Sequence, residues 1–220
     1  MKRLVIAIDG PAGAGKSTVA KALARDLGLN YLDTGAMYRV VALKAKRAGL
    51  GPEHGEAAAA LIEASEIRFE AGEPQRVFLD EEDVTALIRS LEIGELASAL
   101  SVFPAVRVLL VARQKAMVAE GGFTLEGRDV TTVVAPDADV KVYLTASLEE
   151  RARRRFLELN EKGQPDDYGR VRKEMLVRDH RDVTREDSPL TVAPGATVVE
   201  TAGLTPDEVV ERIKRLIPDS

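Results

Sequence analysis

The segment Gly10-Pro-Ala-Gly-Ala-Gly-Lys-Ser17 constrains the fold of this chain more than any other feature. It matches the pattern G-x-x-x-x-G-K-[ST], follows the short apolar run Leu4–Ile8, and precedes apolar residues at helical spacing. In such a loop, consecutive backbone N–H groups converge on phosphate oxygens, and the following helix adds the positive end of its dipole. The segment therefore predicts a strand, a phosphate-binding loop and a helix, which together form a nucleotide site.

The side chains at the end of this loop suit a triphosphate and its metal ion. Lys16 can reach the β- and γ-phosphates, Ser17 offers a hydroxyl to Mg²⁺, and Thr18 can contribute a second hydroxyl to a phosphate. We expect the phosphates of a nucleotide to be bound by the whole segment, comprising Gly10, Pro11, Ala12, Gly13, Ala14, Gly15, Lys16, Ser17 and Thr18.

Short apolar runs alternate with helical patterns along the chain, which is typical of βαβ units and a parallel sheet. The expected strands lie at 4–8, 31–32, 123–126, 140–144 and 197–200. The expected helices lie at 17–27, 37–48, 104–119, 147–159 and 171–185, with a last one after Pro206. We predict an α/β protein of the P-loop type, with three α/β/α layers around a parallel sheet of five strands.

Residues 66–85 interrupt this alternation. Ile67–Phe69 and Val77–Leu79 flank the turn Gly72-Glu-Pro74, which is typical of an antiparallel hairpin, and Asp83–Thr85 is a candidate third strand. The surrounding section, residues 52–99, holds twelve acidic and only three basic residues. We therefore expect a small acidic β insert with helices on both sides of it.

Composition excludes several classes of protein. The 220 residues include no cysteine, so disulfides, thiolate nucleophiles and cysteine metal sites are excluded. The net charge of −5 argues against a general binder of nucleic acid polymers. The first apolar run is too short for a membrane span or a signal peptide, so we expect a cytoplasmic protein with no membrane partner. Residues 151–185 carry eleven basic and seven acidic residues, which fits either a solvated, ion-paired helix face or anion binding.

An arginine follows each of two further strand ends. Asp33-Thr-Gly-Ala-Met-Tyr-Arg39 comes after the second expected strand, and Glu126-Gly-Arg-Asp129 comes at the end of the third. Open α/β sheets bind ligands at the carboxyl ends of their strands. Arg39 and Arg128 therefore suggest a second phosphate-bearing ligand opposite the triphosphate.

With these motifs in their order, the sequence resembles the bacterial cytidylate kinases of the nucleoside-monophosphate kinase family over essentially the whole chain. The motifs that carry the resemblance are Asp9–Thr18, Leu32–Arg39, Phe103–Arg107, Glu126–Asp129, Val133–Asp137, and Arg178–Asp182 followed by Arg185. The resemblance implies Mg²⁺-dependent phosphoryl transfer from ATP to CMP or dCMP. It also implies a β insert in the region that binds the nucleoside monophosphate and a mobile helical lid that begins near Arg151.

We accordingly expect residues 1–220 to form a single kinase domain that acts as a monomer. Its core would comprise about 1–35, 100–150 and 186–220, its monophosphate-binding region about 36–99, and its lid with the adjoining helix about 151–185.

The resemblance further implies a role for individual residues. The monophosphate would be held by Thr34, Arg39, Gly127 and Arg128. The cytosine would be read by Ser98, Arg107, Asp129 and Arg185, and the ribose by Arg178 and Asp182. Charge stabilisation during transfer would come from Lys16, Arg39 and Arg128. Mg²⁺ would be held by Ser17 and, through water, by Glu126. The lid arginines on the ATP phosphates would be Arg153 and Arg154.

Some alternatives stay open at this stage. Ser101 could share a helix face with Ser98, Glu126 could instead cap a turn or pair with Arg128, and Asp33 is more readily explained as a turn residue than as a base. At the level of function, the rivals are a P-loop kinase for UMP, AMP or a small metabolite, a GTP-binding switch, and a nucleotide-binding module without catalysis. The switch is disfavoured because the chain has no N-K-x-D run for reading guanine.

Overall fold

The computed structural model describes residues 3–72, 75–161 and 163–218. By its internal contacts the chain divides into two compact units. We call Met1–Leu29 with Gly121–Ser220 the core unit, and Asn30–Glu120 the insert unit.

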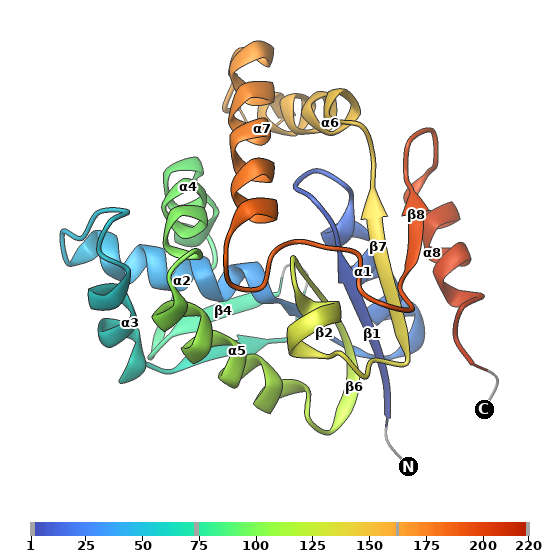
Figure 1. The fold of residues 1–220 in the computed structure, drawn as a ribbon, viewed down its shortest axis with the longest axis horizontal. Coiled ribbons are helices and arrows are strands. Elements are labelled where there is room, and N and C mark those ends of the chain that lie inside the picture. Colours follow the sequence, from blue (N-terminus) through green and yellow to red (C-terminus); the bar gives the residue numbers. More distant parts are fainter. Residues whose placement is uncertain (1–2, 73–74, 162, 219–220) are drawn as a thin grey trace. The chain divides into compact units, whose positions relative to one another are not determined.

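A parallel sheet of five strands in the order β2-β6-β1-β7-β8, with helices on both sides, confirms the predicted fold class (Figure 1). Its strands are β1 (Arg3–Asp9), β2 (Asn30–Asp33), β6 (Gly121–Gly127), β7 (Val140–Thr145) and β8 (Thr197–Glu200). The run Val5–Ile8 is buried on both faces, as expected of a central parallel strand. In register, Asp9 at the end of β1 lies between Gly127 of β6 and Tyr143 of β7, so these three strands end at one edge.

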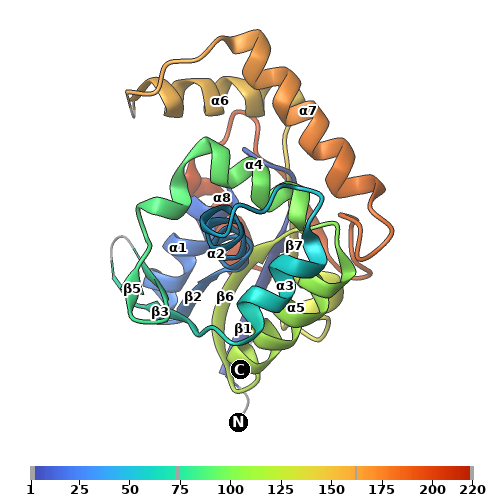
Figure 2. The same ribbon diagram turned by 90° about the vertical axis from the view of Figure 1, so that its left-hand side faces the viewer.

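Of these strands, β2 belongs to the insert unit and the other four to the core unit, whose described residues also form four α-helices and one short π-helical turn. These are α1 (Lys16–Leu27), the turn η2 (Val130–Val134), α6 (Leu148–Glu161), α7 (Tyr168–Thr184) and α8 (Pro206–Lys214). Helix α8 begins with a capping box, in which the Thr205 hydroxyl accepts the N–H of Glu208 and the Glu208 carboxylate accepts the N–H of Thr205. Figure 2 shows α6 and α7 as a neighbouring pair, and Phe156 and Tyr168 meet edge to face between them.

The insert unit has an apolar core of its own and a second sheet. Its helical elements are α2 (Thr34–Arg47), α3 (Gly55–Glu63), the 3₁₀ turn η1 (Leu87–Arg89), α4 (Leu91–Leu100) and α5 (Pro104–Val118). The antiparallel sheet consists of β3 (Ile67–Glu70), β4 (Arg76–Leu79) and β5 (Glu82–Asp83). The apolar core is formed by residues such as Met37, Val40, Ile62, Ile88 and Leu110.

The predicted β insert is therefore present, with two differences in detail. The expected third strand at 83–85 is β5, which ends at Asp83 because the Asp83 carboxylate accepts the N–H of Thr85 and turns the chain. The predicted turn at Gly72–Pro74 includes residues 73–74, which lie outside the described residues.

Within the described ranges, no single helix is long and apolar enough to cross a membrane. The pair α4 and α5, bent by 102° at the break between them, meets the length and composition criteria when taken together.

Candidate active site

The phosphate-binding loop of the core unit connects β1 to α1, as the motif predicts. Gly10 has a φ of +148°, and a Cβ there would lie 2.1 Å from the carbonyl oxygen of Leu144 in β7, so this position accepts only glycine. Gly15, with a φ of +93°, is the N-cap residue of α1, and no side chain caps the helix there. The first-turn N–H groups of α1 are therefore suited to an anion.

Lys16 is buried, and its Nζ donates a hydrogen bond of 2.8 Å to the carbonyl oxygen of Pro11 in the same loop. Burial, followed by the positive charge of Arg128, lowers the pKa of Lys16 to about 7. A phosphate in the loop would supply the negative charge that a buried ammonium lacks.

Asp9 organises the segment that follows β6, a role the sequence did not indicate. Its carboxylate accepts the N–H groups of Val130 and Thr131, at 2.9 and 2.8 Å, and the hydroxyl of Thr131. Burial raises the pKa of Asp9 despite these hydrogen bonds. A usable signal was the acidic residue that directly follows the apolar run Leu4–Ile8, because a buried carboxylate needs hydrogen-bond donors of its own.

Arg128 and Asp182 form a buried ion pair, with 2.8 Å between Nε and Oδ2. Burial raises the pKa of the Asp182 carboxyl, but Arg128 and then Arg178 outweigh it and hold that pKa below its usual value. The positive charge of Arg178 also lowers the pKa of Lys16. The structure thus brings Lys16, Arg128, Arg178 and Asp182 together in one charged cluster.

Arg185 and Asp129 form a second buried pair in the core unit, with 3.5 Å between Nη2 and Oδ1. The Nε of Arg185 donates to the carbonyl oxygen of Ser188 at 2.7 Å, which fixes the guanidinium at the end of α7. Asp129 directly follows Arg128 in the chain, so the two ion pairs are neighbours. Together they place acidic and basic groups beside Gly127, the last residue of β6.

Ser17 and Glu126 are the residues expected from the sequence to hold Mg²⁺ through their oxygen atoms. Glu126 is buried near the end of β6, opposite Ile8 of β1, and its charge acts on both Lys16 and Arg128. Ser17 is exposed in the first turn of α1, next to Thr18. A hydroxyl and a carboxylate are hard oxygen donors, so this set fits Mg²⁺.

The insert unit positions Thr34 and Arg39 on α2. Asp33 is the N-cap of that helix, since its carboxylate accepts the N–H of Ala36 at 3.0 Å, and it pairs with Arg89 at 2.9 Å. Burial raises the pKa of Asp33, but Arg89 and Arg39 together hold it below its usual value. This capping role confirms the structural interpretation of Asp33. Thr34, buried, opens the helix, and Nη1 of Arg39 donates to the carbonyl oxygen of Ile88 at 3.4 Å.

Ser98 and Arg107 of the insert unit are both buried and are linked through Ser101. The hydroxyl of Ser101 donates to the carbonyl oxygen of Ser98 at 2.8 Å, and the carbonyl oxygen of Ser101 accepts from Nη1 of Arg107 at 3.4 Å. The guanidinium of Arg107 lies 6.0 Å from the ring centre of Tyr38. Two residues predicted to read cytosine therefore lie in one small polar group, and Ser101 joins them by a structural contact.

The arginines of α6 have different surroundings. Arg153 is exposed and pairs with Glu150, whereas Arg154 pairs with Glu150 and also donates to Thr201. Arg151, to which the sequence assigned no role beyond the start of the lid, donates to the carbonyl oxygen of Ala12 in the phosphate-binding loop at 3.0 Å and pairs with Asp179 at 2.7 Å. The arginine-rich stretch fitted either an ion-paired helix face or an anion site, and it did not indicate which arginine faces the loop.

Comparison with known sequences gives a consistent result. The sequence pattern of the family described as cytidylate kinase matches residues 6–219. A relative from Desulfitobacterium hafniense, named cytidylate kinase, is 48% identical over 218 residues, covering 99% of this chain and 94% of the relative. A relative of the same name from Listeria welshimeri is 47% identical over 215 residues, covering 98% and 96% of the two chains.

Solved structures with a similar fold have much lower sequence identity. An uncharacterized protein from Eubacterium ventriosum aligns with a TM-score of 0.52 at 11% identity, covering 98% of each chain. A gluconokinase from Sinorhizobium meliloti aligns with a TM-score of 0.50 at 14% identity, covering 98% of this chain and 94% of the other. These likenesses bear on the fold alone.

Proposed function

Because this chain belongs to the cytidylate kinase family, we propose that it transfers the γ-phosphoryl group of ATP to CMP or dCMP, giving ADP and CDP or dCDP. The observation that carries the proposal is the register of β1 with β6, in which Asp9, directly before the phosphate-binding loop, lies opposite Gly127, directly before Arg128. The donor-phosphate loop and the arginine expected to hold the acceptor phosphate therefore follow the same end of two neighbouring strands in the core unit.

On the donor side, the loop amides and Lys16 would bind the β- and γ-phosphates of ATP. Lys16 would balance the charge that moves onto the bridging oxygen during transfer. The acceptor oxygen of a nucleoside monophosphate is already anionic at neutral pH, so the reaction needs no strong general base. Catalysis then rests on in-line positioning and on charge neutralisation by Lys16, Arg39 and Arg128.

The donor set of Ser17 and Glu126 fits a magnesium ion, which the Ser17 hydroxyl and, through water, the Glu126 carboxylate would hold. When bound, Mg²⁺ would neutralise negative charge on the donor phosphates.

On the acceptor side, each unit contributes its own set of groups. In the core unit, Gly127 and Arg128 would hold the phosphate, Arg178 and Asp182 the ribose, and Asp129 and Arg185 the base. In the insert unit, Thr34 and Arg39 would hold the phosphate, and Ser98 and Arg107 the base. The cytosine edge offers an amine donor beside ring-nitrogen and carbonyl acceptors, so carboxylate and hydroxyl acceptors with guanidinium donors suit it.

The helices α6 and α7 would act as a lid that excludes water and so suppresses ATP hydrolysis. The sequence made Arg153 and Arg154 the candidates for contact with the donor phosphates, and of the two we propose Arg153. To reach a phosphate, the exposed Arg153 would have to break its ion pair with Glu150. Arg154 would have to break its ion pair with Glu150 and its hydrogen bonds to Thr201 as well.

The deciding experiment is an acceptor screen. ADP release is measured from ATP and Mg²⁺ with CMP, dCMP, UMP, AMP or GMP, and without an acceptor. We expect strong stimulation by CMP and dCMP only. Equal stimulation by UMP or AMP would favour a kinase with another acceptor. Slow GTP hydrolysis that no acceptor changes would favour a GTP-binding switch.

We further propose that the enzyme acts as a monomer in the cytoplasm, where both nucleotides are available. Light scattering coupled to gel filtration should give a mass near the chain mass of 23.8 kDa. A dimer mass would contradict this part of the proposal.

A further inference from the structure

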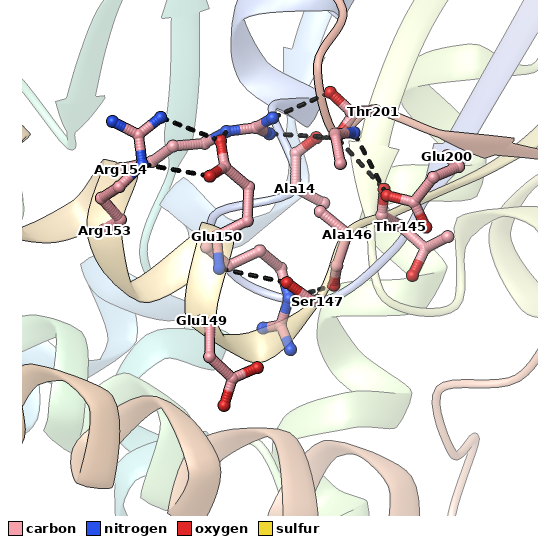
Figure 3. A network of polar contacts seen from close by, with 12 residues as sticks. Ala14, Thr145, Ala146, Ser147, Glu149, Glu150, Arg153, Arg154, Glu200 and Thr201 are labelled. Atoms are coloured by element: carbon pink, nitrogen blue, oxygen red, sulfur yellow. Dashed lines mark hydrogen bonds and ion pairs between the residues drawn. The ribbon is translucent and has the colours of Figure 1, made fainter.

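Thr201, the first residue after β8, lies behind the phosphate-binding loop and is almost fully buried (Figure 3). Its hydroxyl oxygen accepts a hydrogen bond of 3.0 Å from Nη1 of Arg154, and its carbonyl oxygen accepts one of 2.8 Å from Nη2. The same hydroxyl lies 3.3 Å from the carbonyl oxygen of Ala14 and 3.1 Å from that of Thr145. Thr201 thus connects helix α6 to the loop between β1 and α1.

The direction of these hydrogen bonds follows from the chemistry of the groups. A guanidinium has donors only, so the Thr201 hydroxyl must accept from Arg154. Its single proton is then directed to the carbonyl oxygens of Ala14 and Thr145. The backbone N–H of Thr201 also donates to Thr145 at 2.8 Å, which holds the residue in place. Glu150 accepts from Nε of Arg154 at 2.8 Å and holds the guanidinium in turn.

The carbonyl of Ala14 belongs to the same peptide plane as the N–H of Gly15. In a planar trans peptide the C=O and the N–H point in opposite directions. Holding the Ala14 carbonyl toward Thr201 therefore directs the N–H of Gly15 away from Thr201. Gly15 is the N-cap residue of α1, where amides suit a phosphate.

A second carbonyl of the loop is held in a related way. Nη1 of Arg151 donates to the carbonyl oxygen of Ala12 at 3.0 Å, while its Nε donates to that of Ala146 at 2.9 Å. The following amide, that of Gly13, is thereby also fixed in direction. Two alternate peptides of the loop are thus anchored from outside by side chains.

We propose that Thr201, held by Arg154, is a positioning residue that orients the Ala14–Gly15 peptide of the loop for binding the phosphates of ATP. The inference rests on the proposed function only in taking the loop as the donor site. It assigns Thr201 no contact with the nucleotide.

The first test compares two substitutions at one position. Thr201→Val keeps the shape and removes the hydroxyl, whereas Thr201→Ser keeps the hydroxyl. We expect Thr201→Val to raise the KM for ATP about three- to tenfold, the worth of one hydrogen bond, and to leave the KM for CMP within about twofold. Thr201→Ser should restore the KM for ATP. Thr197→Val, the same change at an exposed position of β8, is the matched control.

Calorimetric binding of ADP without an acceptor gives a readout apart from turnover, and Thr201→Val should weaken it by the same factor. Three results would overturn the inference. These are an unchanged KM for ATP in Thr201→Val, a serine variant as impaired as the valine variant, and an equal rise of both KM values with a lowered melting temperature.

A double-mutant cycle tests the part played by Arg154. If Arg154 acts through Thr201, Arg154→Met combined with Thr201→Val should be no worse than the more impaired single variant. If the rise in the KM for ATP in the double variant equals the product of the rises in the two single variants, Arg154 acts on the nucleotide by a contact of its own. That result would overturn its role as the residue that holds Thr201.

The two proposals fail separately in these assays. Absence of CMP-stimulated turnover in the wild-type protein defeats the proposed function. A wild-type protein active on CMP, with Thr201→Val indistinguishable from it in ATP and ADP affinity, defeats the inference.

Discussion

Two arginine–carboxylate pairs, one in the core unit and one in the insert unit, lie in opposite surroundings. In the core unit, the side chains of Arg128 and Asp182 are 17% and 5% exposed, with 2.8 Å between their charged atoms. In the insert unit, those of Arg47 and Glu82 are 43% and 49% exposed, with 2.6 Å between them. The exposed pair is the shorter one, so distance alone does not rank the two.

Burial decides what such a pair does. A solvated pair contributes about 0 to 1 kcal/mol, because water screens it and two long side chains lose freedom. Breaking a buried pair by removing one partner costs about 3 to 5 kcal/mol, since the remaining charge stays out of water. The Arg128–Asp182 pair therefore holds charges where a phosphate would benefit from them, whereas the Arg47–Glu82 pair lies on a solvated surface.

The largest expected effect in the core unit is that of Lys16→Ala. Removing the loop cation should lower kcat about a thousandfold, because its charge would stabilise the negative charge that develops on the phosphates during transfer. Steady-state ADP release measures it, with Lys21→Ala, an exposed position of α1, as the control. Unchanged turnover would contradict the assignment of the loop.

Next in size is Asp182→Asn, which leaves Arg128 buried without its carboxylate. We expect the free energy of unfolding in urea to fall by about 3 kcal/mol at pH 7. The folded-state pKa of Asp182 is below its usual value, so its contribution is present above the unfolded pKa, about 4, and is lost as the pH falls through the folded value.

The difference between wild type and Asp182→Asn should accordingly stay constant from neutral pH down to about pH 5 and narrow below it. A difference that is absent at pH 7, or that grows in acid, would break the proposed contrast between buried and exposed pairs.

Arg185→Ala should act on CMP rather than on ATP. Losing a charge-assisted contact to the base should raise the KM for CMP about ten- to a hundredfold and reduce the preference for CMP over UMP. The control is Arg170→Ala, a 64% exposed arginine in the first turn of α7. If the KM for ATP rises instead, Arg185 does not read the base.

The smallest effect is expected for Glu82→Gln in the insert unit. Its pair with Arg47 is solvated, so the free energy of unfolding should stay within the error of the measurement, and kcat should be unchanged. Urea unfolding at low and high salt measures this. A loss approaching that of Asp182→Asn would remove the distinction between the two units.

Local patterns were sufficient for the elements and for the donor loop. The expected strands and helices are present with small shifts, and Thr205-Pro206 begins α8 through hydrogen bonds within one turn. Gly10 was identifiable from the spacing of the loop motif, which lies within the eight residues from Gly10 to Ser17. Such features depend on residues close in the chain and can therefore be predicted from a single sequence.

Partners far apart in the chain were not predictable in the same way. The carboxylate of Asp9 accepts from residues 130 and 131, and Arg154 meets Thr201 across 47 positions. The sequence showed that residues 151–185 are rich in arginine. It did not show that Arg151 faces the phosphate-binding loop while Arg153 faces solvent.

The sequence by itself determined the α/β/α fold, the phosphate-binding loop and the family. These follow from spacing, from glycine conformation and from the order of motifs along one chain. Only the tertiary structure decided which charges are buried together and which hydroxyl holds the loop. Burial and pairing depend on how β1, β6, β7 and β8 align in register, and no local pattern encodes that alignment.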